Sequence, residues 1–238
     1  MEDLTTAMIL AAGYGTRLKP MTDFTPKALL KIDGKPLLEH VIHKLVSEGI
    51  KKIVINTHYL SGMIEEYLMS NKFDAEINVS HEPEILGTGG GIKNAMPYLL
   101  SDKFFLVYNV DVISNVNISE MFRFHIMKNS LVTLAIQNRE TLRPLLFDSR
   151  GLLVGRLRGG EELKYRDTSG QLFRTGFCGV HIVSNRIFDN FCESGFFDIF
   201  DTYFRLAKEG KLIYGYDIGE SKWLDVGTLE DFNRTIRY

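Results

Sequence analysis

The sequence predicts an α/β fold in which a mixed, mostly parallel sheet is covered by helices on both faces. The first observation behind this prediction is that strand-like apolar runs alternate with helix-period stretches through the first 112 residues. The second is that glycines or an aspartate follow several of these strands, which is where such sheets bind ligands. The third is a change after Ser130 to mainly strand-like segments, which would complete the sheet.

The elements of the first half are assigned from hydrophobic periodicity and from helix start and stop signals. They are, in order, a buried strand over 6–12, a helix from Pro36 to Gly49, a strand over 52–57, a helix over 61–69 with Ser61 as its cap, a weaker strand over 76–80, the glycine-rich stretch 87–91 with a helix through about Leu99, and a strand over 104–110 that ends at Asp111.

The second half is predicted to be rich in strands. The strands are expected at 131–136, 144–148, 152–157, 171–183 and 212–217, and helices near 186–192, 198–208 and 228–236. The polar stretch 158–170 resembles a hairpin tip or flap. No repeat or linker interrupts the chain, so we expect one domain over 1–238, with halves of about 1–112 and 113–238.

Composition and charge exclude several classes of function. With 28 basic and 30 acidic residues the net charge is −2, which argues against a nucleic-acid-binding surface. No apolar run approaches the length of a membrane helix, and residues 1–10 do not resemble a signal peptide. Cys178 and Cys192, like the six histidines, show no metal-ligand spacing, so a reducing cytoplasmic location is expected.

A local positive charge surrounds the first glycine loop, Gly13-Tyr14-Gly15. Residues 13–35 contain five basic residues, among them Arg17 and Lys27, and only two acidic residues. Glycines after a buried strand allow backbone N–H groups to approach a phosphate, and a guanidinium binds phosphate oxygens in a bidentate way. The loop is neither a P-loop nor a dinucleotide fingerprint, and a G-x-G alone also fits a simple tight turn.

Longer motifs make the chain similar to a known family. Leu10-Ala11-Ala12-Gly13-x-Gly15-Thr16-Arg17-Leu18-x-Pro20-Met21-Thr22 followed by Pro26-Lys27 resembles the signature of the sugar-1-phosphate nucleotidyltransferases (NDP-sugar pyrophosphorylases). The resemblance continues through Pro36-Leu37-Leu38-Glu39, Gly87-Thr88-Gly89-Gly90-Gly91, Asn109-Val110-Asp111 and Trp223-Leu224-Asp225-Val226-Gly227-Thr228. The chain most resembles the short N-acetylmuramate-1-phosphate uridylyltransferase type. The resemblance implies a Rossmann-like nucleotidyltransferase fold with a nucleotide half and a sugar-phosphate half.

The resemblance also implies roles for individual residues. Arg17, Lys27, Asp111 and Asp225 would be catalytic, with Asp111 and Asp225 holding Mg²⁺, whose preferred ligands are oxygens. The nucleotide would be bound by Ala11, Ala12, Gly13, Gly15, Thr16, Arg17, Glu82, Gly87 and Thr88. Glu82 would meet the base, and a carboxylate can accept hydrogen bonds from either uracil or guanine, so UTP and GTP both remain possible.

The sugar-phosphate half departs from the family pattern. The residues implied there are Lys27, Asn109, Arg156, Arg158, Thr175 and Gly176. Many family members carry Glu-Lys-Pro where this chain has Gly155-Arg156-Leu157-Arg158-Gly159, so the family lysine is missing. Arg156 or Arg158 would replace that cation, and strand alternation places both on one face without choosing between them.

The implied activity is Mg²⁺-dependent transfer of a nucleoside monophosphate from an NTP to a sugar 1-phosphate, with release of pyrophosphate, in nucleotide-sugar biosynthesis. N-acetylmuramate 1-phosphate with UTP is the first expectation, which would link the protein to cell-wall metabolism. Mannose or heptose 1-phosphate with GTP, phosphocholine cytidylyl transfer, and a nucleotide-sugar sensor without turnover are the alternatives. No nucleic-acid or membrane partner is expected, and the sequence leaves the oligomeric state open.

Overall fold

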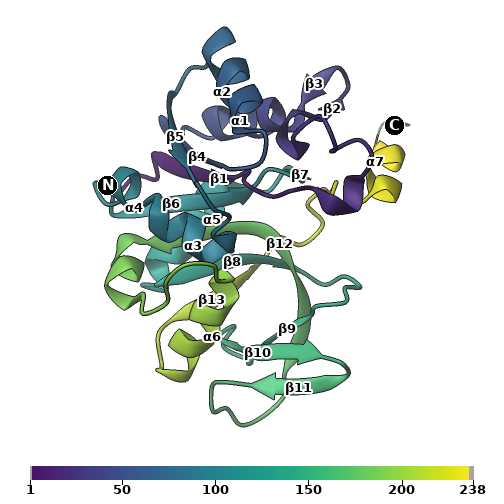
Figure 1. Ribbon diagram of the computed structural model, residues 1–238. Helices are drawn as coiled ribbons and strands as arrows, with labels where there is room; N and C mark the ends of the chain where they lie inside the picture. The colour runs from purple at the N-terminus through teal and green to yellow at the C-terminus, as the bar shows by residue number, and fades with distance from the viewer. Residues whose placement is uncertain (1, 236–238) are drawn as a thin grey trace.

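The computed structural model describes residues 2–235 and contains a large mixed sheet with helices on both sides (Figure 1). The strands are β1 (Thr6–Leu10), β2 (Lys31–Ile32), β3 (Lys35–Pro36), β4 (Lys52–Thr57), β5 (Glu76–His81), β6 (Phe104–Asn109), β7 (Val112–Ser114), β8 (Val132–Gln137), β9 (Leu145–Phe147), β10 (Leu153–Arg158), β11 (Glu161–Lys164), β12 (Phe173–Ser184), β13 (Ile213–Asp217) and β14 (Trp223–Asp225). The α-helices are α1 (Leu37–Ser47), α2 (Ser61–Ser70), α3 (Gly87–Asn94), α4 (Met96–Leu99), α5 (Ile118–Met127), α6 (Ile199–Lys208) and α7 (Leu229–Thr235). Three short 3-10 turns are η1 (Thr16–Leu18), η2 (Lys27–Leu29) and η3 (Asn185–Asn190).

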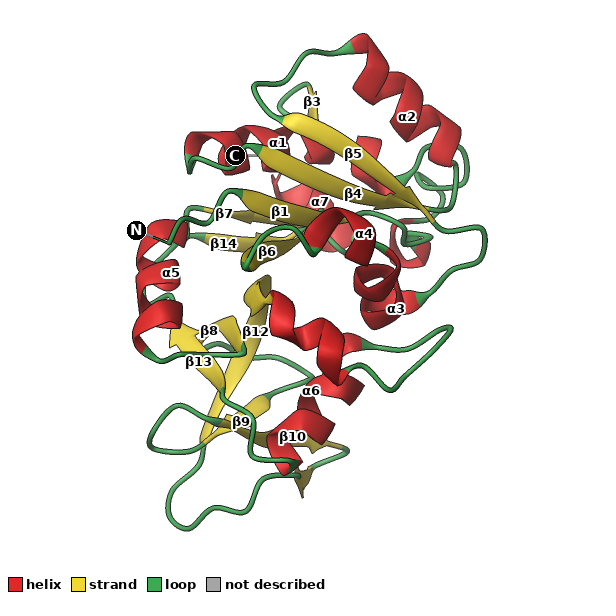
Figure 2. Cartoon of the chain, turned by 90° about the vertical axis from the view of Figure 1, so that its left-hand side faces the viewer, coloured by secondary structure: helices red, strands yellow, loops and turns green. Residues whose placement is uncertain are grey.

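The sheet has the strand order β11-β10-β9-β12-β6-β1-β4-β5, with β8 and β13 joined beside β12. The strands β6, β1, β4 and β5 are parallel to one another and follow one another in Figure 2. Antiparallel pairing joins β12 to β6, β8 and β9. The predicted α/β fold class with a mixed sheet is therefore confirmed, and its parallel part is concentrated in the first half of the chain.

Strand alternation explains the three layers. In β1, Ala7 and Ile9 face one hydrophobic core, whereas Met8 faces another. The first core contains α1 and α5, and the second contains α3 and α6. Because successive side chains of a strand point to opposite faces, nearly every residue of a central strand is buried, which produces the unbroken apolar runs in the sequence.

The strand β12 connects the two halves of the sheet. Its second part, from Val180 to Ser184, pairs with β6, and its first three residues pair with β9 (Figure 1). Between these parts the register with β8 shifts, and Gly179 has a positive φ of 72°. A left-handed residue inside a strand marks a bulge that bends it, and glycine adopts this conformation without strain.

Several local predictions were wrong. The stretch from Gly87 to Gly91, which the glycines suggested would be a loop before the helix, forms the first turns of α3. The N-cap of α2 is Leu60 in a left-handed conformation, with no side-chain cap, so Ser61 is the first helical residue instead. The helix α5 and the short strands β7 and β14 were not predicted. None of the helices within residues 2–235 has the length and apolar character to span a bilayer.

Candidate active site

The Gly13–Gly15 loop follows β1, and only one of its two glycines is required by the local structure. Gly15 has φ +65°, and a Cβ there would lie 2.8 Å from the Cγ2 atom of Thr22. The Thr22 hydroxyl donates a hydrogen bond to the Gly15 carbonyl at 2.9 Å, which holds the turn. Gly13 is exposed and a Cβ there would meet nothing within 4 Å. The fold itself therefore requires glycine at 15 and leaves the surface over Gly13 open to a ligand.

Lys27 and Asp111 form an ion pair in which both side chains are largely buried, 12% and 15% exposed. Lys27 begins η2, and Asp111 follows β6 at its carboxyl end. The Asp111 carbonyl also accepts a hydrogen bond from the backbone N–H of Val226 at 2.8 Å. This bond ties the end of β6 to the segment that carries Asp225.

Asp225 reaches the same region because β14 pairs with β7 and sets Asp225 opposite Val112. Arg17 lies there as well: a Cβ on the buried Gly227 would be 2.5 Å from Asp225 Oδ1 and 2.7 Å from Arg17 Nη2. The structure thus brings together Arg17, Lys27, Asp111 and Asp225, the four residues predicted to be catalytic. Gly227 was missed as a site residue, although the motif that contains Asp225 includes it.

The electrostatics of this cluster favour an additional cation. Burial raises the pKa of the Asp225 carboxyl, and the nearby Asp111 carboxylate raises it further, while Lys27 and Arg17 act in the opposite direction. Asp225 Oδ1 is buried and has no hydrogen-bond partner in the described part of the chain. A buried carboxylate oxygen without a partner is costly, and a bound cation would satisfy it.

The donor set fits Mg²⁺ bound jointly by protein and substrate. Within residues 2–235 no group of three or more His, Cys, Asp or Glu side chains could hold a metal ion. Mg²⁺ commonly takes only one or two carboxylates and completes its shell with water and phosphate oxygens. Asp111 and Asp225 therefore fit a cation that binds together with a phosphate substrate.

The position of Glu82 corrects the expectation that its carboxylate meets the base. Its side chain is completely buried, with Oε1 accepting a hydrogen bond from Asn56 Nδ2 at 2.7 Å and Oε2 from the backbone N–H of Leu86 at 2.9 Å. The Asn56 Oδ1 atom accepts a hydrogen bond from the backbone N–H of Ala11 at 2.7 Å. Glu82 therefore connects the start of the first glycine loop to the segment before α3, and does not face solvent.

The second glycine cluster lies in α3, where close packing against neighbouring segments leaves no room for side chains. A Cβ on Gly89 would lie 2.2 Å from the ring of Phe197, and one on Gly91 would lie 2.6 Å from Glu82 Oε1. The Thr88 hydroxyl accepts a hydrogen bond from the backbone N–H of Ile199 at 2.9 Å, at the start of α6. These glycines let α3 approach its neighbours, while Gly87 and Thr88 remain accessible at its N-terminus.

Tyr14 and His58 connect the first glycine loop to the backbone of Glu82. The Tyr14 hydroxyl lies 3.1 Å from His58 Nε2, and His58 Nδ1 lies 2.8 Å from the Glu82 carbonyl oxygen.

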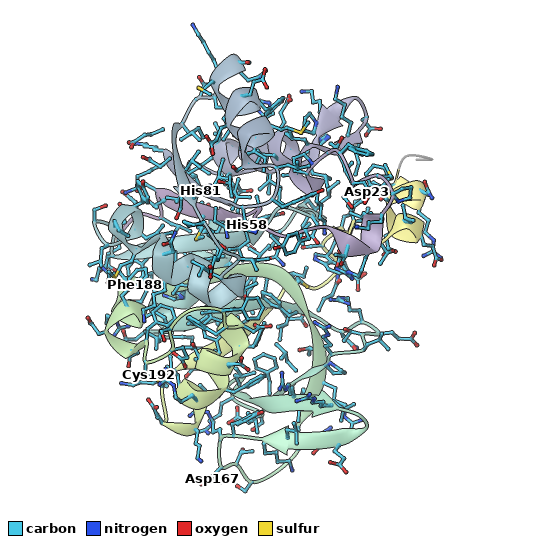
Figure 3. The ribbon with its side chains drawn as sticks, in the orientation of Figure 1. Asp23, His58, His81, Asp167, Phe188 and Cys192 are labelled. Atoms are coloured by element: carbon cyan, nitrogen blue, oxygen red, sulfur yellow. The ribbon has the colours of Figure 1, made fainter. Side chains whose placement is uncertain are left out.

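His58 lies near the centre of Figure 3, whereas Asp167 is at the lower end. A polar cavity of about 590 Å³ lined in part by Asp148, Arg150 and Asp167 lies at that lower end. That cavity is lined by none of the four converging residues.

The residues predicted for the sugar-phosphate half divide between two faces of the sheet. Asn109 ends β6 and packs against Gly179, where a Cβ would meet its Nδ2 atom at 3.0 Å. Gly176 is buried beneath the Arg139 guanidinium, whose Cζ would be 2.7 Å from a Cβ there. The sugar-phosphate role of Gly176 stays a prediction, and the packing of Arg139 over this residue gives a structural reason for glycine there. Gly179 is the glycine of β12 next to the Asp111 end of β6.

Arg139 is fixed by backbone and aromatic contacts and was missed from the sequence. Its Nη2 donates to the Phe177 carbonyl at 2.7 Å, and its Cζ lies 4.0 Å from the centre of the Trp223 ring. On the face of the sheet opposite Gly176, the Arg156 and Thr175 side chains are half-buried. Arg158 is exposed near the end of the β10–β11 hairpin.

Residues 6–144 match the model of the nucleotidyl transferase family. The chain is 31% identical over 232 residues to the mannose-1-phosphate guanylyltransferase catalytic subunit beta of Xenopus tropicalis, covering 95% of this chain and 62% of that protein. It is 28% identical to the D-glycero-alpha-D-manno-heptose 1-phosphate guanylyltransferase of Aneurinibacillus thermoaerophilus, covering 96% and 95% of the two chains. The crystal structure of HddC from Yersinia pseudotuberculosis superposes with a TM-score of 0.78 and 23% identity, covering 98% and 99% of the two chains, which shows a shared fold.

Proposed function

Because the chain belongs to the nucleotidyl transferase family, we propose that it transfers a nucleoside monophosphate from an NTP to a sugar 1-phosphate and releases pyrophosphate. The observation that carries this proposal is the convergence of Arg17, Lys27, Asp111 and Asp225 beside the Gly13–Gly15 loop. Two cations and two carboxylates beside an open glycine loop suit a reaction between two phosphate groups.

The reaction requires charge neutralisation and alignment more than proton transfer. An oxygen of the sugar phosphate attacks the α-phosphorus of the NTP, the bond to the β-phosphate oxygen breaks, and pyrophosphate leaves with the electron pair. The nucleophile is already an anion, so no general base is needed. The catalyst must offset the repulsion between the two substrates and hold them in line.

Different residues would neutralise charge and align the two substrates. The Gly13–Gly15 loop offers backbone N–H groups to the triphosphate, and Arg17 neutralises charge on the departing pyrophosphate. Lys27, which pairs with Asp111, would lie between the nucleotide and the incoming sugar phosphate. Asp111 and Asp225 would hold Mg²⁺, which when bound supplies further neutralisation of the phosphate oxygens.

Different observations support different substrates. The named functions of the Xenopus and Aneurinibacillus relatives support GTP with a mannose or heptose 1-phosphate. The short motif Thr88-Gly89-Gly90-Gly91-Ile92 supports the alternative of UTP with N-acetylmuramate 1-phosphate, an acceptor that carries a carboxylate. We place GTP first for the nucleotide, and the acceptor is taken up in the next section.

The test is pyrophosphate release from the purified chain. GTP, UTP, CTP, dTTP and ATP are each combined with sugar 1-phosphates and with phosphocholine, with Mg²⁺ and with EDTA. We expect Mg²⁺-dependent release that requires both substrates and is fastest with GTP. If no pair of substrates gives pyrophosphate above the EDTA control, while nucleotide sugars still bind, the chain is a sensor and the proposal fails.

A further inference from the structure

Arg156 differs from every other half-buried arginine within residues 2–235. Arg139, Arg166 and Arg205 each donate hydrogen bonds to carbonyl or carboxylate oxygens. The Arg156 side chain makes no hydrogen bond or ion pair with the described residues, and its Nε, like that of Arg139, is buried without a partner. A partly buried guanidinium with no acceptor is unfavourable in the free protein, and such groups mark positions where a ligand supplies the acceptor.

Thr175 lies on the same face of the sheet and shares this property. The registers Arg156 to Leu145 and Leu145 to Thr175 place the three residues side by side on β10, β9 and β12. Directly paired residues point to the same face. The Thr175 Oγ1 atom is also buried without a hydrogen-bond partner. A cationic donor and a hydroxyl, each with a buried atom that has no partner, therefore lie on the same face of the sheet.

Aromatic rings of α6 pack against this face of the sheet. The Arg156 Cζ lies 5.1 Å from the centre of the Phe204 ring, and the Phe177 and Phe200 rings meet edge to face at 5.2 Å. Phe200 and Phe204 are four residues apart and so lie on one face of the helix. The aromatic contact orients the guanidinium without neutralising it.

Ideal helix and strand geometry gives two estimates that put Arg156 far from Asp111 and the Gly13–Gly15 loop. On α6, Asp198 contacts Thr88 at the nucleotide half, and Phe204 is six residues, or about 9 Å, further along. On β12, Gly179 packs against Asn109, and Thr175 is four residues, or about 13 Å, further along. Arg156 lies two strands, or about 10 Å, beyond Thr175 across the sheet. An arginine at this position does not reach Asp111, so it is not the replacement for the missing family lysine at the transferred phosphate.

We propose that Arg156, assisted by Thr175, binds a second anionic group at the distal end of the acceptor, and so selects sugar 1-phosphates that carry a carboxylate or a further phosphate. This inference rests on the proposed function, since it concerns the acceptor of the same reaction. Arg158, exposed at the hairpin, is not required for it. The preferred acceptor would then be an acidic sugar 1-phosphate rather than a neutral mannose or heptose 1-phosphate.

The test compares anionic and neutral acceptors with the best nucleotide. N-acetylmuramate 1-phosphate carries a carboxylate, mannose 1,6-bisphosphate carries a second phosphate, and N-acetylglucosamine 1-phosphate and mannose 1-phosphate are their neutral counterparts. We expect kcat/KM to be about 10- to 100-fold higher for one of the anionic acceptors than for its counterpart, the range of a charge-assisted hydrogen bond. The acceptor that shows the preference distinguishes a carboxylate from a phosphate.

The variant Arg156→Gln should remove this preference. We expect a higher KM for the anionic acceptor, a kcat within a few-fold of the wild type, and an unchanged KM for the neutral one. Arg156→Lys should restore part of the preference. Arg174→Gln is the matched control: Arg174 adjoins Thr175 on β12 but points to the opposite face, where it pairs with Glu162 at 3.0 Å.

Thermal unfolding separates binding from a structural role. Removing an unpaired, partly buried charge should leave the melting temperature of Arg156→Gln at or above that of the wild type. The inference is overturned if neutral acceptors are used as well as anionic ones, if Arg156→Gln lowers kcat/KM equally for both, or if the variant only unfolds earlier. Absence of pyrophosphate with every acceptor would instead count against the proposed function, and calorimetric binding of N-acetylmuramate 1-phosphate to wild type and Arg156→Gln would then decide the role of Arg156.

Discussion

Lys27 and Asp111 are 84 residues apart in the sequence and form one ion pair at the carboxyl end of β6. The pair holds the ammonium group next to the carboxylates rather than in solvent, because only 12% of the Lys27 side chain is exposed. Asp111 thus has two roles in the proposed reaction: it orients Lys27 and it provides an oxygen for a cation.

The first prediction concerns Asp111→Asn. We expect pyrophosphate release to fall by about 10²- to 10³-fold, because both the orientation of Lys27 and one cation ligand are lost. The free energy of unfolding should change much less than turnover does, since Lys27 keeps the nearby Asp225 carboxylate as a counter-charge and the repulsion between the two carboxylates is removed. Asp102→Asn is the control, because Asp102 pairs with Lys52 at 2.5 Å before β6 begins. Undiminished turnover of Asp111→Asn would remove the cation assignment.

A second prediction uses the open surface over Gly13. Gly13→Ala should leave the melting temperature unchanged or slightly higher, because the added Cβ meets nothing within 4 Å and no positive φ is involved. It should nevertheless raise the KM for the NTP by about tenfold or more, since the methyl group would stand where phosphate oxygens approach the backbone. Gly62→Ala, in α2 and equally uncrowded, is the control and should leave the KM unchanged. Equal KM values for Gly13→Ala and the wild type would show that the loop is only a turn.

The buried Glu82 gives a third prediction. Glu82→Ala leaves Asn56 Nδ2 and the Leu86 N–H without their acceptor. We expect the free energy of unfolding to fall by about 2 to 6 kcal/mol, at about 1 to 3 kcal/mol for each of the two unpaired groups. The measurement is urea denaturation, with the exposed Glu84→Ala as the control that should stay within about 0.5 kcal/mol. A loss as small as that of the control would show that the network carries little energy.

Two buried histidines predict a dependence of stability on pH. Burial lowers the pKa of His125 and of His181 to about 3, below the value near 6.5 expected when the chain is unfolded. The unfolded chain therefore binds these protons first as the pH falls, and stability present above pH 6.5 is lost below it. Each histidine should contribute about 1.4 kcal/mol per pH unit between pH 6 and 5.

Chemical denaturation at pH 7, 6 and 5 checks this slope. His125→Leu removes one of the two groups and should reduce the histidine contribution to the slope by about half. His43→Asn changes an exposed histidine and should not alter it. A slope that is the same in all three proteins would assign the pH dependence to other groups.

The sequence predicted the regular elements well because burial on both sides of the sheet leaves a clear pattern. The strand over 52–57 and the helices near 61–69 and 198–208 lie within about one residue of β4, α2 and α6. What the sequence could not supply were contacts between distant short segments. The pairing of β14 with β7 involves three residues on each side, too few to produce a periodic signal, yet it brings Asp225 to Asp111.

The sequence also could not show which polar residues are buried. Glu82 beside Pro83 resembles a surface glutamate in sequence, and only its two hydrogen-bond partners, one of them 26 residues away, make its burial tolerable. In the same way, strand alternation put Arg156 and Arg158 on one face, but the packing of α6 distinguishes them. The motifs identified candidate residues, and the fold determined which of them share a space.

The course of β12 has a mechanical consequence. Its hydrogen bonds to β6 at one end and to β9 at the other make the nucleotide half and the sugar-phosphate half parts of one ladder. Within that strand the bulge at Gly179 separates the residues that pair with β6 from those that pair with β9. Any movement of one half relative to the other should therefore bend β12 at Gly179 and leave both sets of hydrogen bonds intact.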